Sequence, residues 1–378
     1  MRSNLRRLVM GLLVLVFAVL FTAGGVLAQD PTATPEPEEG GEDYYAEQVI
    51  VGEGEVDVAS YAKEGPYRIG FSNGFSGNSW RKLMLASLDM ELANHDDIEE
   101  LIILDGQGDV NKQISDIESL IAQEVDAILV IANSDTAVAP ILKEATELGI
   151  ITIPFNLPVQ GEDYTAYVGV DPAKKGEYWG QWLADTLEEG DKIVALGGLP
   201  GNGYTATAWG AAEPIIEEAG IEVLAFRDAY WEEDRAKTIM SDLLAAYPEI
   251  DGIWCDGGQV CTGALKAMIA ANRPLVPVTG DDYHGLLRLY HENHEAQPQF
   301  DFFTISEPTW ESVIALRAAL SILRGEETPV IQLIEPSPIT PANYADYFRE
   351  DFPDSVFVDT PVPDDILLEI FGEEAASQ

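Results

Sequence analysis

The chain of 378 residues carries 21 basic and 66 acidic side chains, a formal net charge of −45. A surface of this charge repels nucleic-acid phosphate and anionic lipid, so we expect no nucleic-acid partner. The length exceeds what one small core supports and predicts two lobes.

The first residues have the pattern of a secretory signal peptide. Arg2, Arg6 and Arg7 precede an apolar run over residues 8–26, and small residues suited to cleavage follow at residues 26–28. We therefore predict a signal peptide over residues 1–28, with an uncleaved signal anchor as the alternative. The chain after it carries 18 basic and 66 acidic residues, a net charge of −48. We expect an exported protein, periplasmic or extracellular and associated with the cell surface.

An acidic, proline-containing segment over residues 29–66 follows the signal peptide. Because its first part lacks aliphatic core residues, it is predicted to form a linker and a lead-in to the folded body. No Cys follows the apolar run directly, so we expect no lipid attachment there.

Strands and helices alternate from residue 67 onward. A helix over residues 110–123 shows the pattern clearly, since Ile114, Ile117 and Ile121 share one face. The first series has predicted strands at residues 67–71, 101–104, 127–131 and 150–153, with helices at 80–94, 110–123 and 137–148. The second series has predicted strands at 166–170, 192–196, 221–226, 252–255, 276–279 and 302–305, with helices at 173–187, 203–218, 233–247, 258–272, 286–292 and 310–324.

Aliphatic strands that alternate with amphipathic helices predict parallel sheets covered on both faces. Two such series predict an α/β protein with two doubly wound parallel-sheet lobes. In sheets of this kind a ligand binds beyond the carboxyl ends of the strands, so the residues that follow each strand are the candidates.

Amides, carboxylates and aromatic side chains follow the predicted strands. Carboxylates and amides bind vicinal hydroxyls, and aromatic faces cover the C–H face of a sugar, so this set suits a neutral polyol. Each such residue also has an ordinary role in turns and helix caps. Trp80 in a polar loop, and the adjacent Tyr230 and Trp231, favour a binding surface. The candidates are Asn73, Phe75, Asn78, Trp80, Arg81, Asp105, Asn156, Tyr230, Trp231, Asp256, Asp281, Asp282 and Glu307.

Signatures of enzymes and metal sites are absent from the sequence. The chain has neither a nucleophile elbow nor a phosphate-binding loop, and the two histidines of residues 291–294 do not have the zinc-binding spacing of H-E-x-x-H. We therefore expect a non-enzymatic protein without catalytic residues, metal or cofactor. The two cysteines, Cys255 and Cys261, form either a local disulfide or two buried thiols.

Several segments together resemble the type I periplasmic binding proteins, and within them the ribose- and xylose-type sugar-binding subunits of ABC transporters. The resemblance covers residues 67–330 and is most specific where Asn133 follows the apolar run of residues 127–131. It implies two lobes joined by three hinge strands, with ligand in the cleft. The segments are residues 67–72, 116–132, 150–154, 263–265 and 279–282.

The family's ligand residues are carried over position by position. The family's Asn-x-aromatic segment falls on Asn78 and Trp80, and its two Asp positions fall on Asp105 and on Asp281 or Asp282. Its third-loop aromatic falls on Tyr230 or Trp231, its Asn near Asp256 or Gly257, and its last-crossover Gln on Ser306 or Glu307. Two arginine positions are not matched, because Asn156 and Trp209 stand at or near them. Trp209 joins the candidates on this basis, and the particular sugar stays open.

The resemblance also implies a domain plan and a function. Lobe 1 is predicted over residues 67–164 plus 308–329, and lobe 2 over residues 165–307 plus 330–340. An acidic tail over residues 341–378 is expected to wrap the body or to fray. We expect a monomer that captures a small polar ligand, most simply a monosaccharide, by hinge closure and delivers it to an ABC permease. The alternatives are a ligand-sensing subunit of a receptor or chemotaxis system, and the binding of a cationic amine by the same fold.

Overall fold

The computed structural model describes residues 44–48 and 50–375. The predicted signal peptide and residues 29–43 of the predicted linker lie outside this range, as do the last three residues of the predicted tail. The described residues from Glu47 onward form one compact unit. Within the described residues, no helix combines the length and apolar character needed to cross a membrane.

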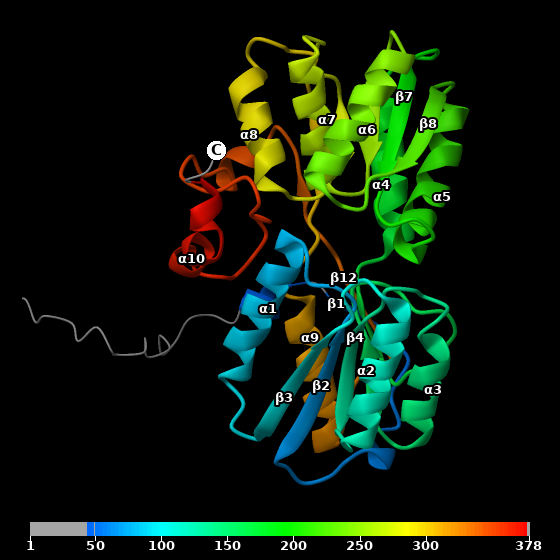
Figure 1. Ribbon diagram of the computed structural model, residues 1–378, viewed down its shortest axis with the longest axis vertical. Helices are drawn as coiled ribbons and strands as arrows, with labels where there is room; N and C mark the ends of the chain where they lie inside the picture. The colour runs from blue at the N-terminus through cyan, green and yellow to red at the C-terminus, as the bar shows by residue number, and fades with distance from the viewer. Residues whose placement is uncertain (1–43, 49, 376–378) are drawn as a thin grey trace, which may run out of the picture. The chain divides into compact units, whose positions relative to one another are not determined.

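The first lobe is built on a four-stranded parallel sheet in the order β3-β2-β4-β5. Helix α1 packs beside α9 and α2 packs beside α3, so helices cover the sheet (Figure 1). The strands are β2 (Tyr67–Asn73), β3 (Ile98–Asp105), β4 (Ala127–Ile131) and β5 (Ile151–Pro154). The helices are α1 (Ser79–Leu92), α2 (Val110–Ala122), α3 (Ala139–Glu147) and α9 (Glu311–Arg324).

The second lobe is built on a six-stranded sheet in the order β13-β11-β10-β9-β7-β8, parallel except for β13. The strands are β7 (Lys192–Gly197), β8 (Glu222–Asp228), β9 (Gly252–Cys255), β10 (Val278–Gly280), β11 (Phe302–Ile305) and β13 (Pro338–Ile339). The helices are α4 (Pro172–Thr186), α5 (Gly203–Glu218), α6 (Glu233–Ala246), α7 (Gly258–Ala270) and α8 (His284–Asn293).

Strand β7 shows why this sheet is buried on both faces. Successive side chains of a strand point to opposite faces, so its continuous aliphatic run needs an apolar layer on each side. Val194 and Leu196 join a core cluster with residues of α6, α7 and α8. Ile193 and Ala195 join a second cluster with residues of α4 and α5. The predicted α/β class with two covered parallel sheets is confirmed.

Three crossovers connect the lobes: one from β5 to α4, one from β11 to α9, and one from α9 to β13. Strands β6 (Tyr167–Gly169) and β12 (Ile331–Ile334) lie on the first and third crossovers and pair in parallel. Strand β1 (Ile50–Glu53) adds to β12 in antiparallel orientation, so the predicted lead-in forms part of a three-stranded hinge sheet. The exact lobe boundaries stay a prediction.

The C-terminal segment is folded against the body. It contains the helix α10 (Asp364–Ala375) and buries three aromatic side chains, Phe352, Phe357 and Phe371. Of the two outcomes expected for the tail, its described part therefore shows packing against the body.

Candidate functional site

The carboxyl ends of strands from both lobes lie around one cavity, the position at which sheets of this kind bind ligands. First-lobe loops, second-lobe loops and the crossovers all contribute to it. The lining residues are Phe75, Asn78, Trp80, Arg81, Asn156, Leu157, Tyr204, Trp231, Asp256, Gln259, Asp281, Glu307 and Phe357.

The start of α1 supplies the first-lobe side of the cavity. The Asn78 side chain caps this helix by accepting a hydrogen bond from the backbone N–H of Arg81 at 3.0 Å. This cap places Trp80 and Arg81 in the first turn. The indole N–H of Trp80 donates to the backbone oxygen of Glu307 at 3.0 Å, which joins the first lobe to the crossover that follows β11.

Buried polar atoms without hydrogen-bond partners lie at or beside this cavity. The side chain of Arg81 is buried, and its Nη1 has no partner among the described residues. Burial lowers the pKa of Arg81 to about 9, although Glu311 and other nearby carboxylates oppose the shift. The Oε1 of Gln259 is likewise unpaired within the described part. Because an unpaired buried polar group is costly, these atoms are suited to bind the polar groups of a ligand or of water.

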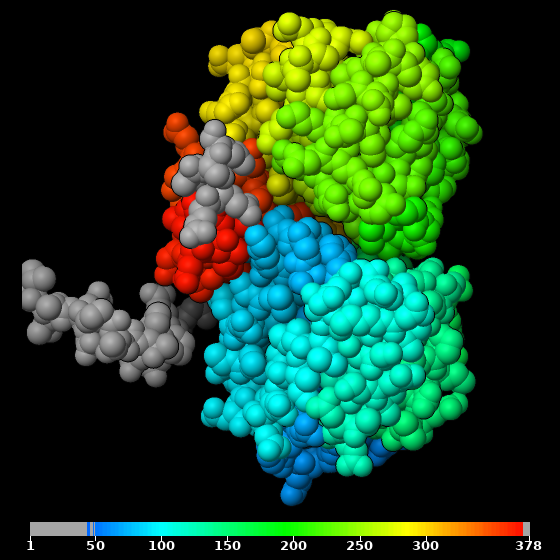
Figure 2. Space-filling model, in the orientation of Figure 1, coloured from blue at the N-terminus to red at the C-terminus, as the bar shows by residue number. Residues whose placement is uncertain are grey.

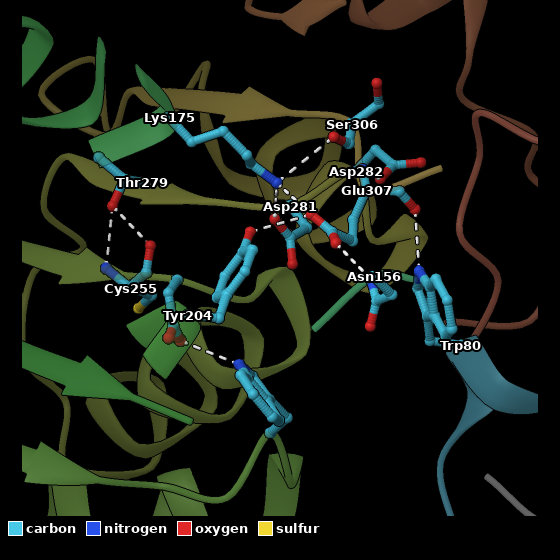
Figure 3. A network of polar contacts seen from close by, with 12 residues as sticks. Trp80, Asn156, Lys175, Tyr204, Cys255, Thr279, Asp281, Asp282, Ser306 and Glu307 are labelled. Atoms are coloured by element: carbon cyan, nitrogen blue, oxygen red, sulfur yellow. Dashed lines mark hydrogen bonds and ion pairs between the residues drawn. The ribbon is translucent and has the colours of Figure 1, made fainter. Parts of the chain in front are cut away.

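A fully buried lysine organises the crossover side of the cavity (Figure 3). The Nζ of Lys175 lies 3.0 Å from Oδ1 of Asp281 and 2.5 Å from Oε2 of Glu307. The same Glu307 accepts a hydrogen bond from the Tyr204 hydroxyl at 2.9 Å and one from Nδ2 of Asn156 at 2.8 Å. Both carboxylate oxygens of Glu307 are therefore already occupied by protein groups.

A close approach of two helices brings Lys175 into this position. Gly176 of α4 faces the backbone of Ala208 in α5, and a Cβ at Gly176 would lie only 2.0 Å from the Ala208 oxygen. Any larger residue would force the helices apart. Lys175, one residue earlier, is thus held against Glu307 and the ring of Tyr204.

The charges of this network compensate one another. Burial alone would lower the pKa of Lys175, but the carboxylates of Asp281 and Glu307 outweigh it and raise that pKa. Burial raises the pKa of Asp281 well above its ordinary value, despite the opposing effect of Lys175. The site therefore holds a cation that stays charged between two acidic groups.

Asp256 anchors the second-lobe side of the cavity. Its Oδ2 accepts hydrogen bonds from the Thr205 hydroxyl at 2.5 Å and from the Gly198 N–H at 3.2 Å. Its Oδ1 accepts one from the indole N–H of Trp231 at 3.1 Å. Burial raises the pKa of Asp256 to about 6, although all three hydrogen bonds favour the ionised form. Trp231 is thereby held over the cavity.

Backbone strain marks the loops around the cavity. Asn156, Tyr230 and Trp231 have φ values of 63°, 63° and 54°, in the left-handed region that non-glycine residues rarely adopt. Such strain is typical of binding sites because it holds a side chain in a required direction. The Trp231 ring also lies against Gly198, where a Cβ would come within 2.1 Å of it.

The cysteines form a disulfide, which was one of the two alternatives left open by the sequence. Cys255 ends β9 and Cys261 lies in α7, so the bond closes the turn that carries Asp256.

Nine of the predicted ligand residues line the cavity. They are Phe75, Asn78, Trp80, Arg81, Asn156, Trp231, Asp256, Asp281 and Glu307. A role in ligand binding stays a prediction for each of them.

Five predicted residues do not line the cavity. Asn73 is buried at the end of β2. Asp105 accepts hydrogen bonds from Ser76 and from the backbone N–H of residue 107. Trp209 packs against Phe226 and Trp254 in the core, because it points about 140° away from Tyr204 around α5.

The other two make contacts beside the site. The Tyr230 ring stacks on the Arg235 guanidinium at 3.6 Å. The Asp282 carboxylate accepts the backbone N–H groups of Glu307 and Asp359, both at 2.8 Å.

Sequence reasoning missed four lining residues and two buried charges beside them. The lining residues are Leu157, Tyr204, Gln259 and Phe357, and the charges are Lys175 and Glu311. Tyr204 and Gln259 follow strands β7 and β9, so the strand-end rule could have found them. Within the described residues, no group of histidine, cysteine or acidic side chains could hold a metal ion.

The family model for the periplasmic binding protein domain matches residues 69–327. The ribose import binding protein of Bacillus subtilis is 25% identical over 228 residues, which are 60% of this chain and 73% of that protein. The xylitol-binding protein of Mycolicibacterium smegmatis is 29% identical over 232 residues, which are 60% of this chain and 65% of that protein. The chain thus spans about two thirds of the length of these relatives.

A solved structure shows the same fold. The fructose-binding periplasmic domain of a hybrid two-component system superposes with a TM-score of 0.67 at 25% identity, covering 74% of this chain and 92% of that chain. The match to the family model spans well over half of the chain, and the resemblance stated from the sequence is confirmed. The chain belongs to the periplasmic binding protein family, a family of solute-binding proteins and not of enzymes.

Proposed function

We propose that this protein is an extracytoplasmic solute-binding protein that captures a neutral sugar or sugar alcohol and delivers it to an ABC importer. The observation that carries the proposal is a cavity that combines aromatic faces with compensated polar groups. Trp80, Trp231 and Phe75 offer faces for the C–H side of a sugar ring, and Arg81, Asn156 and Gln259 offer hydrogen bonds to hydroxyls. Ribose and xylitol, the ligands named for two relatives, are neutral polyols.

The charge balance of the site favours a neutral ligand over a cationic amine. An amine needs an ionised carboxylate that lacks a cationic partner, but Glu307 already pairs with Lys175 and also accepts hydrogen bonds from Tyr204 and Asn156. Asp281 already has Lys175 as its counter-ion. The acidic residues at these strand ends, which on their own would suit an amine, therefore already have a cation, Lys175, beside them.

Hinge closure is the mechanism that this arrangement supports. Trp80 and Arg81 belong to the first lobe, whereas Trp231 and Asp256 belong to the second, so one ligand can contact both. A ligand that makes extra contacts when the lobes are closed shifts the population toward the closed form. Small-angle scattering should then show a smaller radius of gyration with ligand than without it.

Two variants test the site assignment. We expect Trp80→Ala and Asp281→Ala each to weaken ligand binding at least tenfold, about 1.4 kcal/mol, in titration calorimetry. Trp182→Ala is the matched control, because Trp182 stacks on Phe303 and is not among the lining residues. Thermal melts establish that each variant is folded. Unchanged affinity in both site variants would show that the ligand does not bind in this cavity.

A sensing subunit is the second candidate function. It is favoured by the similarity to a domain of a hybrid two-component system. The two functions differ in the partner that recognises the loaded protein. Stimulation of the ATPase of a co-purified permease by the loaded protein supports transport, and stimulation of a receptor kinase supports sensing.

A further inference from the structure

The C-terminal segment, defined here as residues 341–375, runs from the second lobe to the first outside the three crossovers. It follows β13 at the edge of the second-lobe sheet and ends in α10, which Figure 1 draws in red beside α1. Its contacts fall into three parts, one on each lobe and one at the cavity.

The middle of the segment is fastened to the start of α8. Asp354 forms ion pairs with Arg288 at 2.7 Å and with Lys266 at 3.1 Å. The backbone N–H groups of His284 and Gly285 donate to the oxygens of Val356 and Asp354 at 2.8 and 2.9 Å. The segment is thus attached to the second lobe by side-chain and backbone bonds together.

The segment carries an aromatic residue into the ligand cavity. Phe357 is 1% exposed, lines the cavity, and meets the Tyr283 ring edge to face at 5.6 Å. On either side of its ring the backbone is fixed, since Tyr283 and Phe357 form a β-bridge and the Val358 N–H donates to the Asp282 oxygen at 2.9 Å. Asp282 directly follows Asp281, the partner of Lys175. The segment is therefore bonded to the residue next to Asp281, which belongs to the polar network around Lys175.

Helix α10 contacts the first lobe. Leu367 and Phe371, one turn apart, are 2% and 0% exposed, whereas Leu368 between them is 40% exposed. The ammonium group of Lys82 lies 5.5 Å from the centre of the Phe371 ring. Lys82 follows Trp80 and Arg81 in α1, so α10 rests on the helix that supplies the first-lobe side of the cavity. Figure 2 shows the surface of α10 against that of α1.

We propose that the C-terminal segment is a working part of the binding site: Phe357 shapes the cavity and determines which polyols fit, and α10 latches the first lobe to the second. The proposal rests on the function proposed above. A fourth connection between the lobes restrains hinge opening, because the lobes separate fully only when Phe371 leaves its buried position. The latch consequently slows the release of bound ligand.

Substitution of Phe357 tests the first part. D-xylose and D-glucose differ by one hydroxymethyl group, so their affinity ratio reports the size of the cavity. We expect Phe357→Ala to change this ratio at least fivefold in titration calorimetry, and Phe357→Leu, which keeps an apolar side chain, to change it less. A ratio within twofold of the wild-type value in Phe357→Ala, with both sugars still bound, overturns the assignment of Phe357 to specificity.

Substitution in α10 tests the latch, with Leu368→Ala as the matched control on the exposed face of the same helix. We expect Phe371→Ala to raise the ligand dissociation rate at least fivefold in stopped-flow fluorescence, and Leu368→Ala to leave it within twofold. Equal rates in the two variants overturn the latch.

A measurement without ligand separates this proposal from the proposed function. Both native cysteines are joined in the disulfide, so spin labels can be placed selectively at Glu118→Cys on α2 and Asp242→Cys on α6. We expect Phe371→Ala, and not Leu368→Ala, to lengthen the distance between the lobes in the ligand-free protein. An unchanged distance contradicts the latch. A wild-type protein that binds no sugar, together with a lengthened distance, contradicts the proposed function and leaves the latch supported.

Discussion

Replacing Lys175 with Met should destabilise the protein strongly. The Lys175 side chain is 1% exposed, and those of its partners Asp281 and Glu307 are 6% and 8% exposed, so all three groups are shielded from water. Removing one member of a buried ion pair costs about 3–5 kcal/mol, because the remaining charges lose their compensation. Lys175→Met leaves two carboxylates facing each other, and we expect a loss in this range at pH 7.5.

The loss should depend on pH in a defined direction. In the wild-type protein the raised pKa of Lys175 means that its contribution to stability is present at every pH below its ordinary value of 10.5. Lys175 lowers the pKa of Asp281, so its removal raises that pKa further. The variant then binds a proton as the pH falls, and its destabilisation should be smaller at pH 5.5 than at pH 7.5.

Urea unfolding followed by tryptophan fluorescence measures this loss. Lys174→Met is the matched control, because the neighbouring Lys174 pairs with Glu335 at 2.7 Å while the two side chains are 35% and 40% exposed. An exposed pair of this kind contributes up to about 1 kcal/mol. A loss below about 1 kcal/mol in Lys175→Met, or an equal loss at both pH values, would refute the assigned role of the buried lysine.

Two further predictions concern the second-lobe side of the site. Burial raises the pKa of Asp256 to about 6, so its ionised form costs stability above that pH and the cost is relieved as the pH falls toward 4. Asp256→Asn removes this pH-dependent cost. The melting temperature of the wild type should therefore rise relative to that of the variant as the pH falls from 7.5 to 4.5. Parallel curves contradict the raised pKa. The disulfide joins residues only six positions apart, so replacing Cys255 and Cys261 with Ala should lower the free energy of unfolding by roughly 2 kcal/mol. An unchanged urea midpoint in that variant contradicts this stabilising role.

The fold was predictable because its strands and helices follow local patterns. A buried parallel strand such as β4 is a continuous aliphatic run, and the residues that follow such strands lie at one edge of the sheet. Trp80, Asp256 and Asp281 were found by that rule. Strand β1 was missed because three of its four residues are exposed and show no apolar run.

The rest of the site depends on contacts between distant segments. Lys174 and Lys175 are adjacent on α4, and their local sequence does not distinguish the exposed lysine from the buried one. The distinction comes from the close approach of α4 and α5 at Gly176. Phe357 lies in an acidic, proline-rich segment that predicted no fixed position, and it reaches the cavity only because the segment docks on α8. Trp209 was placed in the site by resemblance, but its direction on α5 is set by the core.

Titration calorimetry of the wild-type protein against pentoses, hexoses, sugar alcohols and polyamines tests the central claim most directly. The compensated charges around Lys175 and the aromatic faces of Trp80 and Trp231 predict tight binding of at least one neutral sugar or sugar alcohol and no binding of polyamines. Tight binding of a polyamine, with no heat from any sugar or sugar alcohol, would contradict the account.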